Sequence, residues 1–221
     1  TLALTASADT VNEDQRLASD SVIEGDQFGA EVAIGRDWLF VGVPSWDEEG
    51  GSEDWNGGMV LNFTRGEDSW EPDVSRPRFT CNRTWEMVHS DNYCAQFASF
   101  GHSLAIDQKD DGAFYLAVGR KRNKNYFNPI YYPGVVEAIA FDGASLEVAS
   151  MLGSWGMTGT ASGPEEEFGN SISVSSTGLT PSLLASASLL PGISILPLDE
   201  STDGTTDFVP EGEVGSFGRA V

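Results

Sequence analysis

Short apolar stretches, each about the length of a β-strand, alternate with polar turns along most of this sequence. The pattern is clearest between residues 28 and 63, where "FGAEVAIG", "WLFVGVP" and "GMVLNF" are separated by a tight polar break and a long acidic loop. Runs this short, rich in valine, isoleucine and aromatic residues and bounded by glycine, are typical of strands. The 25 glycines of the chain favour many turns. The sequence therefore predicts an all-β fold.

The same series of stretches repeats along the chain. A phenylalanine–glycine pair opens it at Phe28, Phe100, Phe168 and Phe217. After each of the first three pairs comes a second apolar stretch ("WLFVGVP", "FYLAVGR", "SLLASAS") and then a third ("GMVLNF", "GVVEAIAF", "GISILPL"). A looser fourth stretch follows each time. The repeat predicts units of four antiparallel strands.

Units of this kind must stack on one another, because a single four-stranded sheet cannot cover both of its faces. The repeated phenylalanine can fill the space between adjacent sheets, and the glycine beside it permits a positive φ or a close backbone approach. Radial stacking of such sheets is a β-propeller. We expect blades at residues 25–96, 97–164 and 165–214, the outer strands of a preceding blade at 1–24, and the first strand of a following blade at 215–221.

The pattern resembles the FG-GAP repeat, the blade unit of the integrin α-subunit propeller. In that family Phe-Gly opens the first strand, Gly-Ala-Pro ends the second, and a Gly-x-Val-Tyr-Val-Phe-like third strand follows. The first unit is similar in "FGAEVAIG", "VGVP" and "GGMVLNF"; the second has "VGRKR" and the third "ASASLLPG" in place of Gly-Ala-Pro. Because family propellers typically have seven blades, the resemblance implies a section of a larger ring. A compact four-bladed closure that joins the N-terminal strands to "FGRAV" is the alternative.

The net charge of the chain limits the classes of molecule that it is expected to bind. Its 34 acidic and 12 basic residues give a formal net charge of −22 and a pI near 4.1. A field of this sign repels phosphate backbones, so nucleic acids and anionic membranes are excluded as expected partners. Either the carboxylates bind cations such as calcium, or they keep the surface soluble. No stretch reaches the ~20 apolar residues of a membrane helix.

Two cysteines and two glycosylation sequons indicate the compartment. Cys81 and Cys94 flank a polar loop, and a disulfide between them would contribute roughly 3 kcal/mol. The same loop contains "NRT" at Asn82, and "NFT" begins at Asn62, in an expected strand. Both fit the acceptor pattern for N-glycosylation. Cysteines and sequon in one loop predict a secreted glycoprotein in an oxidising compartment.

The resemblance also implies a place for calcium. Integrin-type blades often carry an Asp-x-Asp/Asn-x-Asp pattern between the first and second strands, and alternate side chains of such a loop can surround one cation. The nearest match is "IDQKDDGAFYL", which offers Asp107, Asp110 and Asp111. Lys109 stands where a ligand is expected, and Tyr115 stands where the last Asp should be. A solvated acidic turn is the alternative.

One basic and aromatic segment stands out from the acidic chain. Residues 119–134, "GRKRNKNYFNPIYYPG", carry four of the 12 basic residues. Arginine and tyrosine are enriched at protein interfaces, so this loop is a candidate contact with another protein or another copy of the chain. The alternative is that its aromatic residues cover the edge of a blade. The candidate contact residues are Arg120, Lys121, Arg122, Lys124, Tyr126, Tyr131 and Tyr132.

No motif in the sequence indicates catalysis. It has two histidines and lacks a His-Glu-x-x-His helix, a Gly-x-Ser-x-Gly elbow and a phosphate-binding Gly-Lys-Ser/Thr loop. The resemblance instead implies a non-catalytic extracellular module for adhesion or surface assembly, with protein or glycan partners. The alternative is the propeller domain of a secreted hydrolase or polysaccharide lyase whose catalytic residues lie elsewhere.

Overall fold

A computed structural model gives the fold of the chain. It describes residues 15–47, 57–73, 78–80, 99–120, 123–124, 131–132, 134–142, 146, 148–156, 168–176, 182–187, 193–198 and 206–207. All regular structure in these ranges is β-strand, and the strands form three larger sheets and one small hairpin. The predicted all-β class is confirmed.

Sheet 1 contains the first repeat. Its strands are β1 (Val32–Ile34), β2 (Trp38–Val43), β3 (Met59–Arg65), β4 (Trp70–Pro72) and β5 (Arg78–Thr80). The order is β1-β2-β3-β4, with β5 also paired to β3, and every pairing is antiparallel. All six residues of β2 are buried, because both faces of the sheet are covered.

Sheets 2 and 3 repeat this order. Sheet 2 contains β6 (Ser103–Gln108), β7 (Phe114–Arg120), β10 (Val135–Phe141) and β11 (Val148–Gly156), which are antiparallel neighbours in that order. A short fifth strand, β15 (Thr206–Asp207), pairs in parallel with β11. Sheet 3 contains β12 (Phe168–Ser175), β13 (Ser182–Ala187) and β14 (Ile193–Pro197). Strands β8 (Asn123–Lys124) and β9 (Tyr131–Tyr132) form the hairpin.

The core lies between the sheets and on the outer face of sheet 1. Trp38 and Phe40 of sheet 1 pack against Phe114 of sheet 2, each with ring centroids 5.8 Å apart. On the other face of sheet 2, a second cluster joins it to sheet 3; its members include Tyr115, Ala117, Val136, Ala138, Val174, Leu183 and Ala185. A third cluster on the outer face of sheet 1 is covered by Leu17, Val22 and Phe28. The layers therefore follow the order segment 15–28, sheet 1, sheet 2, sheet 3.

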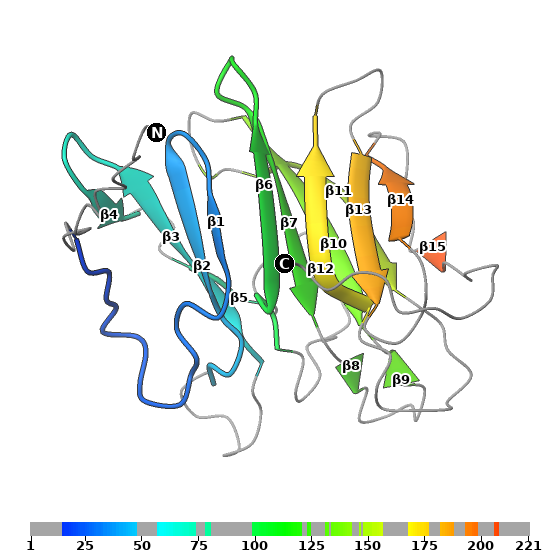
Figure 1. The fold of residues 1–221 in the computed structure, drawn as a ribbon, viewed down its shortest axis with the longest axis horizontal. Helices are drawn as coiled ribbons and strands as arrows, with labels where there is room; N and C mark the ends of the chain where they lie inside the picture. Colours follow the sequence, from blue (N-terminus) through cyan, green and yellow to red (C-terminus); the bar gives the residue numbers. More distant parts are fainter. Residues whose placement is uncertain are drawn as a thin grey trace, which may run out of the picture.

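The first strands of the three sheets lie next to one another. Strand β6 contacts both β1 and β12, and the three run side by side in the middle of Figure 1. Each sheet then extends away from this line through its second and third strands. The sheets are not closed into a ring by the described residues.

The junctions between consecutive sheets are built alike. The glycines of the first three Phe-Gly pairs all have positive φ, at 79° for Gly29, 83° for Gly101 and 77° for Gly169. A Cβ on Gly42 of β2 would lie 2.0 Å from the carbonyl oxygen of Gly101, and a Cβ on Gly119 of β7 would lie 2.6 Å from that of Gly169. Real Cβ atoms do not approach so closely, so both positions require glycine.

The strand register supports this equivalence. Ser103, two residues after Gly101, is opposite Gly119, and Ser171, two residues after Gly169, is opposite Ser186. In sheet 1 the N–H of Gly42 donates to the carbonyl of Glu31, two residues after Gly29, at 2.9 Å. The three Phe-Gly pairs thus occupy matching places in consecutive sheets.

Candidate functional site

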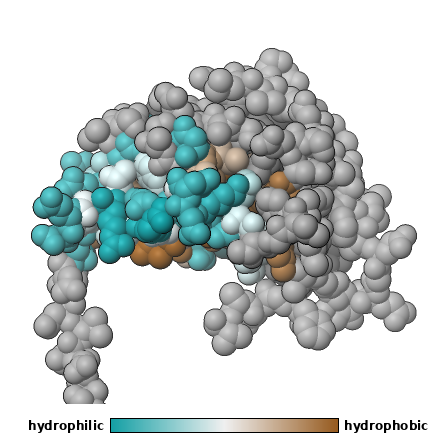
Figure 2. All heavy atoms as spheres, turned by 90° about the horizontal axis from the view of Figure 1, so that it is seen from above, coloured by the Kyte–Doolittle hydropathy of each residue, from teal (hydrophilic) through white to brown (hydrophobic). Residues whose placement is uncertain are grey.

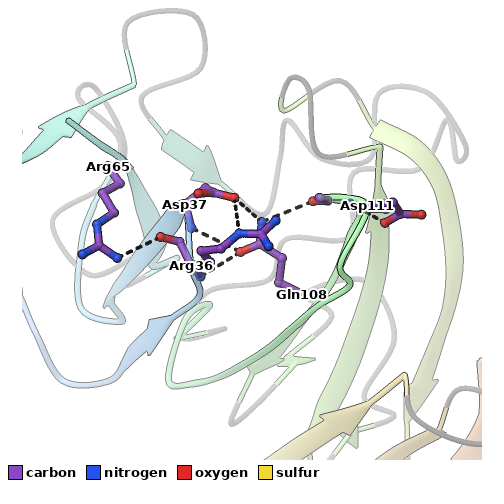
Figure 3. Close-up of polar contacts among 7 residues, drawn as sticks. Arg36, Asp37, Arg65, Gln108 and Asp111 are labelled. Carbon is purple, nitrogen blue, oxygen red and sulfur yellow. Dashed lines mark hydrogen bonds and ion pairs between the residues drawn. The ribbon is translucent and has the colours of Figure 1, made fainter. Parts of the chain in front are cut away.

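Two turns, one from sheet 1 and one from sheet 2, meet at one end of their first strands. The β1–β2 turn is closed by the N–H of Gly35, which donates to the carbonyl of Trp38 at 2.8 Å. The β6–β7 turn is closed by Lys109 N–H, which donates to Ala113 carbonyl at 2.7 Å. Gly112, with φ of 96°, makes the sharp bend there. We call the side chains at this meeting point the turn rim; they are Arg36, Asp37, Arg65, Gln108 and Asp111 (Figure 3).

Gln108 joins the two turns. Its carbonyl oxygen accepts from the N–H groups of Arg36 at 2.8 Å and Asp37 at 3.2 Å. Its amide donates to Oδ2 of Asp37 at 2.8 Å and to the carbonyl of Gly112 at 3.3 Å. A glutamine amide offers two donors and two acceptor positions, and all four are used here. Figure 3 shows Gln108 lying between the turns, which fixes them relative to each other.

The charged groups of the turn rim are exposed but held in position. Nε of Arg36 lies 3.1 Å from Oδ2 of Asp37, and these side chains are 54% and 51% exposed. A pair this exposed contributes about 0–1 kcal/mol to stability. Nη1 of Arg65 donates to the carbonyl of Arg36 at 3.3 Å. The backbone N–H of Arg65 donates to the carbonyl of Asp37 at 3.0 Å. The rim therefore presents fixed positive and negative groups to solvent.

The turn rim was not predicted from the sequence. Neither the "GRDW" turn nor Gln108 belongs to a recognisable motif in the sequence. A polar residue at the end of a first strand was the only local signal. The hydrogen-bond partners of Gln108 in sheet 1 are Arg36 and Asp37, which are about 70 residues away in the sequence. Its role therefore depends on how sheet 1 packs against sheet 2.

The three carboxylates proposed for calcium do not converge. Asp107 accepts from the N–H of Ser176, directly after β12, and Oδ1 of Asp111 accepts from the N–H of Ala113 at 3.0 Å. Asp110 is exposed. Within the described ranges, no group of three or more His, Cys, Asp or Glu side chains is arranged to hold a metal ion. The calcium site at Asp107, Asp110 and Asp111 stays a prediction that this arrangement does not support.

A protein cation lies in this turn. Nζ of Lys109 lies 4.6 Å from the centroid of the Tyr115 ring. These are the two residues at which the sequence departs from the calcium pattern. A cation–π contact of this kind contributes about 0.5–2 kcal/mol. The ammonium group thus supplies positive charge beside the carboxylates of the turn.

We expect chelation of calcium to leave the Tm of the native chain unchanged, and Lys109→Asp to introduce calcium dependence. The substitution removes the ammonium group and adds a hard oxygen ligand to the turn. At a calcium concentration about one hundred times Kd, binding would stabilise the variant by roughly 3 kcal/mol. Differential scanning calorimetry with calcium and with chelator measures both effects. A drop in the Tm of the native chain on chelation would restore the original calcium prediction.

Arg120, predicted to contact a partner, is buried inside the molecule, and this is a correction. Its Nη2 lies 2.5 Å from Oε1 of Glu137 in β10, and their side chains are 6% and 0% exposed. Register places Arg120 opposite Val135 and Glu137 opposite Val118, so the two face the same side of sheet 2. The basic charge at position 120 neutralises a buried carboxylate and is not available to a partner.

The rest of the predicted contact loop is described only in part. Strands β8 and β9 place Lys124 opposite Tyr131, and Asn123 opposite Tyr132, in an antiparallel hairpin. The partner role of these residues stays a prediction. Lys121, Arg122 and Tyr126 lie outside the described residues.

The two predicted glycosylation sites differ in what the structure says of them. Asn62 lies in β3 opposite Phe40 and is 1% exposed, on the face that packs against sheet 2. A glycan needs an exposed amide, so this burial argues against glycosylation at Asn62 in the folded chain. Asn82 lies outside the described residues, as do Cys81 and Cys94, and their roles stay predictions.

Polar contacts also join sheets 2 and 3 beside the glycine junction. Nε2 of His102 lies 3.0 Å from Oδ1 of Asn170, and Oγ of Ser103 donates to the carbonyl of Gly169 at 2.5 Å. His102 and Asn170 each directly follow a Phe-Gly pair. His102 therefore has a packing role at the interface between sheets 2 and 3.

Comparisons with known proteins add no relative. No protein-family model matches the chain, and no curated protein matches it at a significant level. In the part of the chain that the structure describes, no helix is long and apolar enough to cross a membrane.

Proposed function

We propose that the chain is a section of an FG-GAP-type β-propeller that acts as a non-catalytic extracellular module for adhesion or surface assembly. The two equivalent glycine junctions carry the proposal. Gly101 approaches Gly42 of the preceding sheet, and Gly169 approaches Gly119 in the same way. A repeated junction rotates each sheet relative to the previous one by a similar amount, and such repetition builds radial architectures.

The placement of the first strands also supports a propeller section. In a propeller the first strands line the axis and the later strands extend outward. Strands β1, β6 and β12 are neighbours here, and the second and third strands of each sheet follow in order away from them (Figure 1). Stacking these sheets buries an apolar cluster at each of the two interfaces.

The turn rim is the proposed ligand-binding region. Arg36 and Asp37 are exposed, and backbone and side-chain hydrogen bonds hold their turn against the next one. Recognition of a protein or glycan favours polar groups whose positions are set before binding, because less conformational entropy is then lost. Both turns belong to the same end of consecutive sheets, so they present one continuous surface.

We expect the chain to bind extracellular polysaccharides or glycoproteins through this rim, and Arg36→Ala to weaken binding at least tenfold, about 1.4 kcal/mol. The substitution removes an exposed guanidinium group that pairs with the exposed Asp37 side chain. Glycan-array binding followed by biosensor titration of each positive ligand measures the effect. Ser173→Ala, an exposed position on sheet 3, is the matched control. Binding that is unaffected by Arg36→Ala would remove the rim from the proposal.

Extracellular location predicts covalent modification of the loop that contains Cys81 and Cys94. After expression through a secretory pathway, non-reducing peptide mapping should give one linked Cys81–Cys94 peptide pair, with a glycan on Asn82. Asn62 should be unmodified because it is 1% exposed. Free thiols at both cysteines together with an unmodified Asn82 would argue against an extracellular module.

A further inference from the structure

Two aliphatic side chains of β1 are exposed, although their counterparts in the other sheets are covered. Val32 is 49% exposed and Ile34 is 62% exposed. Four and six residues after the next Phe, Leu104 is 6% exposed and Ile106 packs against the first core cluster. In β12 the corresponding residues, Ile172 and Val174, belong to the second cluster. All six face the preceding layer, as the register with β2, β7 and β13 shows.

The glycine that precedes β1, Gly29, also has free space beside it. A Cβ on Gly101 would lie 2.7 Å from the carbonyl oxygen of Met59, and a Cβ on Gly169 would lie 2.5 Å from Cγ2 of Val136. A Cβ on Gly29 would meet nothing within 4 Å, yet Gly29 has the same positive φ of 79°. The backbone at Gly29 therefore has the conformation of a sheet junction, but none of the described sheets packs against it. We call Gly29, Val32 and Ile34 the open strip.

Among the described residues, segment 15–28 covers the outer part of this face of sheet 1. Gln15 exchanges two hydrogen bonds of 2.8 Å with the backbone of Trp70 in β4, and Nε1 of Trp46 donates to the carbonyl of Ser21 at 3.1 Å. Segment 15–28 is therefore held at its start by β4 and further along by Trp46, which follows β2. The described surface is mostly hydrophilic in Figure 2, with small hydrophobic areas, and the large hydrophobic side chains exposed in the described residues are Ile23, Val32 and Ile34.

We propose that the open strip is the docking surface for one more sheet of this repeat, a unit of the sheet 2 type. The inference rests on the proposed repeat architecture and continues the interfaces already present between sheets 1, 2 and 3. The occupant needs a glycine in its second strand, as at Gly42 and Gly119, so that Gly29 can approach. It also needs a small apolar residue in its first strand, as at Ala33 and Ala105.

Sheet 3 of a second copy does not meet these requirements. The register position of Gly42 and Gly119, which the incoming glycine approaches, is held in sheet 3 by Ser186 and not by glycine. Ser173 is exposed where sheets 1 and 2 have Ala33 and Ala105. Head-to-tail stacking of identical chains would therefore pair the open strip with a polar and poorly fitting face.

The test uses cysteine labelling at the open strip. Val32→Cys is made in the 221-residue chain and in a longer chain with a second copy of residues 97–164 inserted between Glu24 and Gly25. The junction 164/25 reproduces the spacing between residue 164 and the following Phe-Gly pair. Ser173→Cys is the exposed reference in both chains, and the unsubstituted chain gives the background from Cys81 and Cys94.

We expect Val32→Cys to react as fast as Ser173→Cys in the 221-residue chain and at least tenfold more slowly in the longer chain. Equal rates for Val32→Cys in the two chains would overturn the proposal. Slow labelling of Val32→Cys in the 221-residue chain would also overturn the proposal. If the labelling becomes faster on dilution, a second copy of the chain covers the strip. If dilution has no effect, other residues of the same chain cover it.

A second measurement needs no insertion. Val32→Lys should leave the Tm of the 221-residue chain within about 2 °C, because a surface substitution changes stability by at most ~0.5 kcal/mol. Leu104→Lys, at the covered counterpart, should lower it strongly. Equal losses at the two positions would show that the strip is already buried. Ligand binding at the turn rim is tested at Arg36, and docking at the open strip is tested at Val32 and Leu104. A failure of one proposal can therefore be distinguished from a failure of the other.

Discussion

Gly42→Ala is expected to destabilise the chain by about 3 kcal/mol, which is roughly 6–12 °C in Tm for a chain of this size. The added Cβ would lie 2.0 Å from the carbonyl oxygen of Gly101, an atom of the backbone that cannot rotate away. Sheets 1 and 2 would have to separate, and the aromatic contacts of Trp38 and Phe40 with Phe114 would loosen. Thermal melting followed by circular dichroism measures the loss.

Other glycines provide matched controls for this substitution. Gly57 has open space for a Cβ, so Gly57→Ala should change stability by no more than ~0.5 kcal/mol. Gly29 has open space but a φ of 79°, so Gly29→Ala should cost only the backbone strain, about 1–2 kcal/mol. Gly119→Ala should behave like Gly42→Ala because it stands at the equivalent junction. A Gly42→Ala variant as stable as Gly57→Ala would contradict the close junction.

Glu137→Leu alone is expected to cost roughly 3–5 kcal/mol, because it leaves the buried guanidinium of Arg120 without its carboxylate. Register makes Arg120 and Glu137 the counterparts of Val43 and Leu61 in sheet 1, two apolar residues of the third cluster. The fold thus already accepts apolar residues at this pair of positions. Urea unfolding gives the free energy of each variant.

The double variant Arg120→Met with Glu137→Leu separates the ion pair from the packing. Removing both charges together should restore most of the stability, since buried ion pairs are often replaced by apolar residues at no cost or with a gain of about 1–4 kcal/mol. Arg120→Met alone should be as costly as Glu137→Leu alone. Additive losses in the double variant would mean that the pair is not coupled, contrary to the 2.5 Å contact between them.

The strands were predictable because their signal is local. Strand β7 covers "FYLAVGR" and β12 covers "FGNSISVS", as the apolar stretches predict, and β2, β3, β10, β13 and β14 differ from the predicted stretches only at their ends. Alternation along β2 places Trp38 and Phe40 on one face and Leu39 and Val41 on the other. The fourth strand was harder to predict, since β4 and β5 both pair with β3, and Thr206–Asp207 joins sheet 2.

The site was less predictable because its contacts cross between sheets. The basic character of residues 119–134 suggested an exposed contact, but Arg120 ends a buried strand and meets Glu137 on the neighbouring one. The carboxylates at Asp107 and Asp111 suggested a cation site, but each accepts a backbone hydrogen bond instead. A charged residue type in a sequence does not reveal which groups will neutralise it.

The amino-acid sequence by itself determined where the strands lie and that Phe-Gly marks the start of each repeat. Both follow from side-chain alternation and from the conformational freedom of glycine, which act over a few residues. Only the tertiary structure decided that Gly42 faces Gly101, that Gln108 ties two turns, and that Val32 and Ile34 are exposed although Leu104 is covered. Those outcomes depend on which sheet packs against which face, and residues distant in the sequence set that packing.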